Sequence, residues 1–269
     1  MKISDQIVFV TGANRGLGRH LTLELLSRGA KVYAGARNPE SIDIPGVIPV
    51  KLDITNPQDV AAAAKVAKDI TLLINNAGSS TGASLLDGDL DQIQLEFNTH
   101  FFGTLSMVRT FAPILANNNG GTILNILSAL SWVSSGTIGA YTAAKAAEWA
   151  LTNDLRLNLY PQNVRVTGLH VGFMETDMTS GLEVPKSNPA DIAKIAIDGI
   201  ESDSFEIVAD DTSRHIQSVL AGGVSDISTT ILIQMTNKVI RPRSDNILWS
   251  GKQRLYGISH NGRIRIPIR

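Results

Sequence analysis

The sequence predicts an α/β fold, a doubly wound parallel sheet of about seven strands with helices on both faces in a single domain. Two observations predict it. Short β-branched segments alternate along the chain with longer helical patterns. The strand segments are also nearly continuous in apolar residues, which is typical of strands covered on both faces. The chain of 269 residues is 43% hydrophobic and is therefore able to bury a substantial core.

The predicted strands all share the apolar, β-branched pattern. They cover residues 6–11, 31–36, 47–52, 71–75, 121–127, 163–170 and 205–209. The predicted helices between them are longer and show helical periodicity. They are Arg15–Ser27, Pro57–Lys68, Asp89–Ala116, Ala140–Leu159 and Pro189–Ile200. Asn-Pro pairs at 56–57 and 188–189 are typical helix starts, because proline fits the first helical position.

Composition excludes several function classes. The formal net charge is −1, so no overall charge favours nucleic acid or an anionic membrane as a partner. There is no cysteine, which excludes disulfides, thiolate metal sites and cysteine nucleophiles, and no metal site is expected. The N-terminus does not resemble a signal peptide, and no stretch approaches the length of a membrane span. We therefore expect a cytoplasmic protein.

A glycine-rich turn follows the first strand. The segment "TGANRGLG", residues 11–18, has the spacing G-x-x-x-G-x-G and leads directly into a predicted helix. Glycines allow a tight turn and a close approach of backbone N–H groups, and a helix N-terminus favours a pyrophosphate. The turn predicts dinucleotide binding through Gly12, Asn14, Arg15, Gly16, Leu17 and Gly18.

The end of the second strand indicates which dinucleotide is bound. NAD sites usually carry an acidic residue there, which accepts a hydrogen bond from the ribose 2′-OH. This chain has Ala36 at that position, followed by Arg37, and Arg15 is a second nearby cation. Two guanidinium groups without a carboxylate suit a 2′-phosphate, so the sequence favours NADP(H) over NAD(H).

The segment "YTAAK", residues 141–145, places Tyr141 and Lys145 on one helical face. A nearby ammonium favours the phenolate, so such a pair can serve as a proton donor or acceptor. The same spacing also occurs in helices where the two residues merely face solvent. The context decides: "NNAG" at 75–78, Asn98 and Ser128 precede the pair, and strand ends of a parallel sheet meet at one edge.

Five motifs in this order and spacing resemble the short-chain dehydrogenase/reductase family, over residues 1 to about 222. The resemblance implies a Rossmann-type fold and a catalytic tetrad of Asn98, Ser128, Tyr141 and Lys145. Tyr141 would be the acid/base, Ser128 would orient the substrate oxygen, Lys145 would bind the nicotinamide ribose and tune Tyr141, and Asn98 would hold a water. The resemblance also implies further cofactor contacts, from Asp53, Ile54, Asn75, Ala77, Gly78, Gly172, Met174 and Thr176.

The expected function is NADPH-dependent interconversion of a carbonyl and an alcohol in a small-molecule substrate. By resemblance, a homodimer or homotetramer is expected. The alternative is a catalytically silent NADP(H)-binding sensor or scaffold. The loop after the sixth strand departs from the family, because Val171-Gly172 stands where Pro-Gly is usual, which leaves the loop entry less rigid. His100 and His170 are interpreted as structural.

Residues 223–269 differ in charge from the rest of the chain. They carry eight Lys or Arg and two acidic residues, a net charge of +6 that leaves −7 on residues 1–222. The asymmetry suggests an appended segment outside the core. It could be a basic tail that binds an acidic surface, a cover for the substrate pocket, or an end without a selected role. We expect it to be unnecessary for catalysis.

Overall fold

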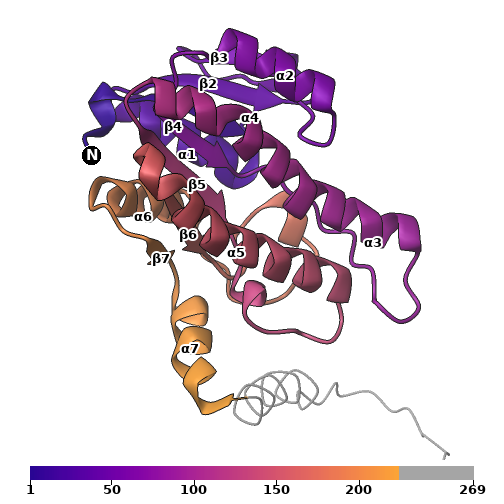
Figure 1. Cartoon of the computed structure of the whole chain (residues 1–269). Coiled ribbons are helices and arrows are strands. Elements are labelled where there is room, and N and C mark those ends of the chain that lie inside the picture. The colour runs from indigo at the N-terminus through magenta and orange to yellow at the C-terminus, as the bar shows by residue number, and fades with distance from the viewer. Residues whose placement is uncertain (224–269) are drawn as a thin grey trace, which may run out of the picture. The chain divides into compact units, whose positions relative to one another are not determined.

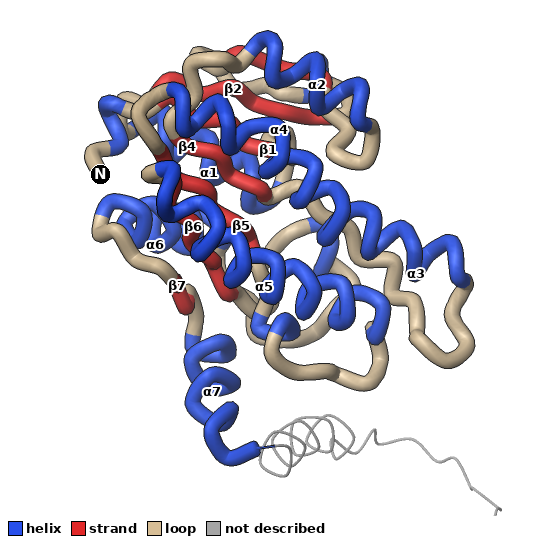
Figure 2. The backbone as a smooth tube through the Cα atoms, viewed as in Figure 1, coloured by secondary structure: helices blue, strands red, loops and turns tan. Residues whose placement is uncertain are grey.

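The computed structural model describes residues 1–223. Apart from residue 223, the segment 223–269 lies outside the described residues, so the prediction made for that segment stays a prediction. The described chain forms one seven-stranded parallel sheet in the order β3-β2-β1-β4-β5-β6-β7 (Figures 1 and 2). The strands are β1 (Ile7–Thr11), β2 (Lys31–Ala36), β3 (Ile48–Lys51), β4 (Leu72–Asn75), β5 (Gly121–Ile126), β6 (Val164–His170) and β7 (Glu206–Val208). The predicted fold class and all seven predicted strands are confirmed.

The helices are α1 (Gly16–Ser27), α2 (Pro57–Val66), α3 (Leu90–Phe97), α4 (Thr104–Asn117), α5 (Gly139–Leu159), α6 (Pro189–Glu201) and α7 (Asp211–Val219). Five of them, α1 and α6 on one side and α2, α4 and α5 on the other, cover the two faces of the sheet. The pleat of β1 shows how two cores arise. Val8 and Val10 pack with α1 and α6 on one face, while Phe9 packs with α2, α4 and α5 on the other. This arrangement explains the continuous apolar runs of the strands.

The predicted helix starts at the two Asn-Pro pairs are confirmed. The Asn56 side chain accepts hydrogen bonds from the backbone N–H groups of Gln58 and Asp59 at the start of α2. The Asn188 side chain accepts one from Ala190 at the start of α6. Each asparagine satisfies a backbone donor that the helix itself leaves without a partner.

Two helical predictions need correction. The segment Asp89–Ala116 is helical as predicted but is not one regular α-helix, because a π-helical turn, Asn98–Gly103, lies between α3 and α4. At that turn Gly103 lies against Ile54, where an added Cβ would come within 2.8 Å of the Ile54 side chain. Helix α7 was not predicted. It begins at Asp210, whose side chain accepts a hydrogen bond from the Ser213 N–H at 2.7 Å.

The strand order reverses between β1 and β4, which places a crevice at their carboxyl ends. In open parallel sheets, ligands bind in such a crevice. The glycine-rich turn leaves β1 there, and "NNAG" leaves β4 there. Within residues 1–223, no helix is both long and apolar enough to cross a bilayer.

Candidate active site

The glycine-rich turn has a backbone that only small residues allow. Gly12 and Gly16 have φ values of +65° and +52°, in the left-handed region that favours glycine. An added Cβ at Gly18 would overlap the carbonyl oxygen of Gly12 and the amide of Asn76. Leu17 and Gly18 are buried in the first turn of α1. The turn therefore leaves its backbone open to close approach at a helix N-terminus, which fits a dinucleotide pyrophosphate.

Asn76 fixes this turn against the end of β4, a role that the sequence analysis missed. Its Nδ2 donates to the carbonyl oxygens of Thr11 at 2.9 Å and Gly12 at 3.2 Å. The Thr11 hydroxyl in return accepts from the backbone N–H groups of Asn76 and Ala77, both at 2.9 Å. The signal was present in the doubled asparagine of "NNAG".

The end of β2 lies beside the glycine-rich turn. The Ala13 N–H donates to Gly35 O at 3.0 Å, and the Asn14 amide donates to the Ser41 hydroxyl at 3.1 Å. Ala36 is buried at the strand end and Arg37 is exposed directly after it. The structure thus brings the loops that carry the two arginines to one edge of the sheet.

Arg15 also reaches toward the loop that follows β6. Its guanidinium lies 3.5 Å from Asp177, and both side chains are exposed. Exposed ion pairs of this kind contribute little to stability, so Arg15 can leave Asp177 for a stronger anion at small cost.

Both residues that were predicted to contact adenine already make contacts within the fold. Asp53 Oδ1 accepts from the backbone N–H and the hydroxyl of Thr55, at 2.9 and 2.7 Å, so it shapes the turn after β3. Ile54 is buried against the π-helical turn. Asp53 remains partly exposed at the carboxyl edge, whereas Ile54 serves chiefly as core.

Asn75 is buried at the end of β4, and its Nδ2 donates to Asn125 Oδ1 on β5 at 2.9 Å. Its own Oδ1 is buried and has no hydrogen-bond partner among residues 1–223. Ala77 is partly exposed and Gly78 is exposed, so both are accessible from the crevice side.

Ser128, Tyr141 and Lys145 lie together at the carboxyl end of β5. Ser128 caps a short 3-10 turn, where its Oγ accepts from the Leu130 N–H at 3.1 Å. Burial raises the pKa of Tyr141, while the charge of Lys145 and a hydrogen bond with Ser128 act in the opposite direction. The Tyr141 residue as a whole is partly exposed, and its hydroxyl group lies beside Ser128.

Lys145 is buried and held firmly in place. Its Nζ donates to Ile126 O and to Glu148 Oε2, both at 2.7 Å. Burial alone would lower the pKa of Lys145, but the negative groups around it, Glu148 foremost, outweigh burial and raise the pKa. Lys145 is therefore a fixed cation beside Tyr141.

Asn98 does not join this cluster, and the prediction that placed it there is corrected. Asn98 is exposed, whereas His100, two residues further along the π-helical turn, is buried. The His100 ring lies edge-on to the Tyr141 ring, with centroids 5.3 Å apart. Residues two apart on a helix point to opposite faces, so only one of the two can face Tyr141.

Two buried carboxylates complete the cluster, and the sequence analysis found neither. Glu96 accepts hydrogen bonds from the Ser79 hydroxyl at 2.9 Å and from the Thr81 backbone, and lies 3.2 Å from His100 Nε2. Burial alone would raise the pKa of Glu96, but these hydrogen bonds outweigh it and lower the pKa to about 2. The available signals were the spacings Glu96/His100 and Lys145/Glu148, each on one helical face.

His170 supports Ser128 from the other side. It is fully buried, with Nδ1 3.2 Å from Ser128 O and Nε2 3.2 Å from Glu206 Oε1. The Trp132 ring stacks on it at a centroid distance of 3.7 Å. The interpretation of His170 as structural agrees with these contacts, which fix the backbone that carries Ser128.

The loop after β6 carries the remaining predicted cofactor contacts. The Gly172 N–H donates to Asp210 Oδ2 at 2.5 Å, which ties the loop to the start of α7. Met174 packs against the core, and Thr176 lies over the glycine-rich turn, 3.5 Å from where a Gly16 Cβ would be. A carboxylate thus anchors the loop where the family usually has proline.

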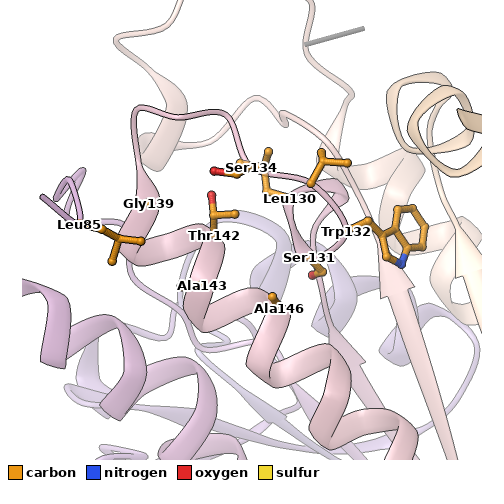
Figure 3. Close-up of a pocket in the computed structure, with 10 residues that line it drawn as sticks. Leu85, Leu130, Ser131, Trp132, Ser134, Gly139, Thr142, Ala143 and Ala146 are labelled. Atoms are coloured by element: carbon orange, nitrogen blue, oxygen red, sulfur yellow. The ribbon is translucent and has the colours of Figure 1, made fainter. Parts of the chain in front are cut away.

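A pocket of about 310 Å³ opens beside the cluster (Figure 3). Its lining is mostly apolar and comes from Leu85, the segment 130–134 and the outer face of α5 at Gly139, Thr142, Ala143 and Ala146. Tyr141, Lys145 and Glu148 occupy the opposite face of α5, as helical periodicity requires. The pocket is therefore distinct from the crevice in which the reactive groups lie.

Comparison with known proteins gives a consistent result. The family described as short chain dehydrogenase matches residues 6–186. An NADPH-dependent 1-acyldihydroxyacetone phosphate reductase of Schizosaccharomyces pombe is 32% identical over 186 residues, 66% of this chain and 62% of the relative. An uncharacterized oxidoreductase of Staphylococcus aureus is 27% identical over 80% of this chain and 99% of its own length.

Among solved structures, a short chain dehydrogenase from Burkholderia cenocepacia in complex with NADP is 36% identical, with a TM-score of 0.80. The match covers 90% of this chain and all of that one. With the parallel sheet, the glycine-rich turn and the Ser128–Tyr141–Lys145 cluster, these matches establish that the chain belongs to the short-chain dehydrogenase/reductase family of oxidoreductases.

Proposed function

We propose that this protein is an NADPH-dependent oxidoreductase that interconverts a carbonyl and an alcohol, with Tyr141 as the acid/base. The observation that carries the proposal is the cluster of Tyr141, Ser128 and the buried Lys145 at the carboxyl edge of the sheet, beside the glycine-rich turn. A silent binding module would not need a phenol, a hydroxyl and a fixed cation at this place.

The glycine-rich turn and the N-terminus of α1 would hold the pyrophosphate, and Lys145 would hold the nicotinamide ribose. When bound, the cofactor supplies the hydride. Arg15 and Arg37 would hold the 2′-phosphate, since their loops meet at one edge and no carboxylate ends β2. The Burkholderia relative, which binds NADP, supports this choice.

Tyr141 would transfer its proton to the carbonyl oxygen during reduction, and Ser128 would orient that oxygen. A phenol is ordinarily protonated at neutral pH, and burial moves the pKa of Tyr141 further upward. A protonated phenol beside the crevice is the state that carbonyl reduction requires.

The function is tested by following NADPH oxidation in the presence of a panel of aldehydes and ketones. The panel includes 1-acyldihydroxyacetone phosphate, because a relative reduces it. Consumption of NADPH with formation of the matching alcohol supports the proposal. Tight NADPH binding without turnover of any member of the panel would instead favour the silent binding module.

Replacing Arg37 with alanine should weaken NADPH binding and leave NADH binding almost unchanged. A charge-assisted hydrogen bond contributes about 1.5–3 kcal/mol, which corresponds to roughly a tenfold to hundredfold change in Kd. Fluorescence titration of both cofactors measures the difference, and Arg109→Ala, which removes an exposed arginine on α4, is the control. Equal losses for both cofactors, or tighter NADH binding by the unaltered chain, would contradict NADP preference.

A further inference from the structure

Glu148 is a buried carboxylate in direct contact with the catalytic lysine. Its side chain is 3% exposed. Oε2 accepts from Lys145 Nζ at 2.7 Å, and Oε1 accepts from the Thr104 hydroxyl on α4 at 3.0 Å. Both side-chain oxygens of Glu148 thus have a hydrogen-bond donor, and its contact with Lys145 is shielded from water.

This contact changes what Lys145 does to Tyr141. A lone ammonium beside a phenol favours the phenolate. Here a compensating negative charge lies 2.7 Å from the ammonium, and a second Lys145 N–H is used by Ile126 O. The attraction that Lys145 exerts on the phenolate is opposed by the repulsion from Glu148, and at low dielectric both effects are strong.

Other charged and titratable groups near the cluster also contribute to the electrostatic environment of Tyr141. Glu96 on α3 is fully buried, and His100 on the π-helical turn lies between the two carboxylates. His100 Nε2 is 3.2 Å from Glu96, and its Nδ1 is 3.8 Å from Glu148. Glu96 and Glu148 both raise the pKa of Tyr141, whereas Lys145 and Ser128 lower it.

We propose that Glu148 partly neutralises Lys145 and so weakens the stabilisation that Lys145 gives to the Tyr141 phenolate, which tunes the proton-transfer step of the site. This inference rests on the proposed function. In reduction, the Tyr141 proton forms the new O–H bond of the alcohol while the carbonyl carbon receives the hydride of the reduced cofactor. The phenolate that remains then recovers a proton from solvent.

Oxidation runs these steps in reverse and needs the phenolate at the start. Below the titration midpoint of Tyr141, each pH unit by which the midpoint lies higher lowers the phenolate fraction about tenfold. Glu148 therefore lowers the fraction of phenolate from which oxidation starts, and it also makes the protonated phenol a weaker acid for reduction. Glu148 acts through Lys145, so it is a positioning residue and not one that touches the substrate.

The test is a spectroscopic titration of the Tyr141 phenolate in the full-length chain, with and without NADP⁺. The near-ultraviolet phenolate absorbance of a matched Tyr141→Phe protein is subtracted, which removes the signals of the other tyrosines. Glu148→Gln keeps the size of the side chain and an oxygen for Lys145. We expect its Tyr141 midpoint to lie lower by about one pH unit or more, and an unchanged or higher midpoint overturns the proposal.

Three further variants separate charge from packing. Glu148→Asp keeps the charge and should titrate close to the unaltered chain, whereas a shift as large as that of Glu148→Gln would assign the effect to packing and overturn the proposal. Glu148→Ala removes the charge without a buried amide and should shift the midpoint in the same direction as Gln. Asp154→Asn removes an exposed carboxylate on the same helix and should have no effect.

Turnover gives a second readout. In Glu148→Gln, the pH at which the rate of alcohol oxidation reaches half of its plateau should move downward together with the Tyr141 midpoint, because oxidation starts from the phenolate. If the unaltered chain turns over no substrate, the proposed function fails, while the phenolate titration still decides the role of Glu148. If it turns over normally and the two pH profiles coincide, the inference alone is overturned.

Discussion

Replacing Tyr141 with phenylalanine is expected to lower kcat for carbonyl substrates by about 10²–10⁴-fold, the range that a positioned general acid contributes. The change removes one hydroxyl group and leaves the ring edge-on to His100 at a centroid distance of 5.3 Å. The cofactor-binding turn lies on a different element, so the Kd for NADPH should remain nearly unchanged. Steady-state kinetics and a fluorescence titration measure the two quantities.

Tyr160→Phe provides the matched control, because Tyr160 is 77% exposed and lies beyond the end of α5. It loses the same hydroxyl group and should retain full activity. A Tyr141→Phe protein that reduced carbonyl substrates at close to the normal rate would show that another group supplies the proton. A large loss of NADPH binding in that variant would point to a structural defect.

The fold could be predicted because its signals are local. Apolar runs covered on two faces, the glycine-rich turn after β1 and the Asn-Pro helix starts are all visible in short windows. The π-helical turn between α3 and α4 was not predicted, because no signal in a short window marks it; within the turn, Gly103 packs against Ile54, a residue about fifty positions away along the chain. The amphipathic helix α7 was missed although Asp210 carries a typical N-cap signal.

The site was predicted in part, for the same reason. Ser128 follows the end of a strand, and Tyr141 and Lys145 share one face of a helix. Regular strand and helix geometry therefore brings the three residues together at the carboxyl edge of the sheet. Asn98 was predicted to point into the site, but His100 points inward instead. A π-helical turn changes by about one residue which helical face is turned inward, and a regular helical pattern does not anticipate that change. Glu148 is a further case: a glutamate among small residues of a helix suggests solvent, and packing against Thr104 of α4 and His100 of the π-helical turn buries it.

Replacing Gly18 with alanine should damage the cofactor site most among the glycine-rich turn variants. An added Cβ would overlap the Gly12 carbonyl oxygen and the Asn76 amide, and would come within 2.9 Å of the Gly12 carbonyl carbon. Two of these three atoms belong to backbone that Asn76 holds by hydrogen bonds, so they cannot move aside at small cost. Overpacking of this kind costs about 1–3 kcal/mol of folding free energy.

For a domain of this size we expect the melting temperature of Gly18→Ala to fall by about 2–12 °C, and NADPH binding to weaken by roughly tenfold or more. Thermal unfolding and cofactor titration measure both effects. Gly181→Ala is the control, since no atom of residues 1–223 lies within 4 Å of its added Cβ and its backbone is not left-handed. Unchanged melting and binding in Gly18→Ala would mean that the turn can open away from β4. The Asn76 hydrogen bonds would then not fix the turn, and the close approach at Gly18 would matter neither for folding nor for cofactor binding.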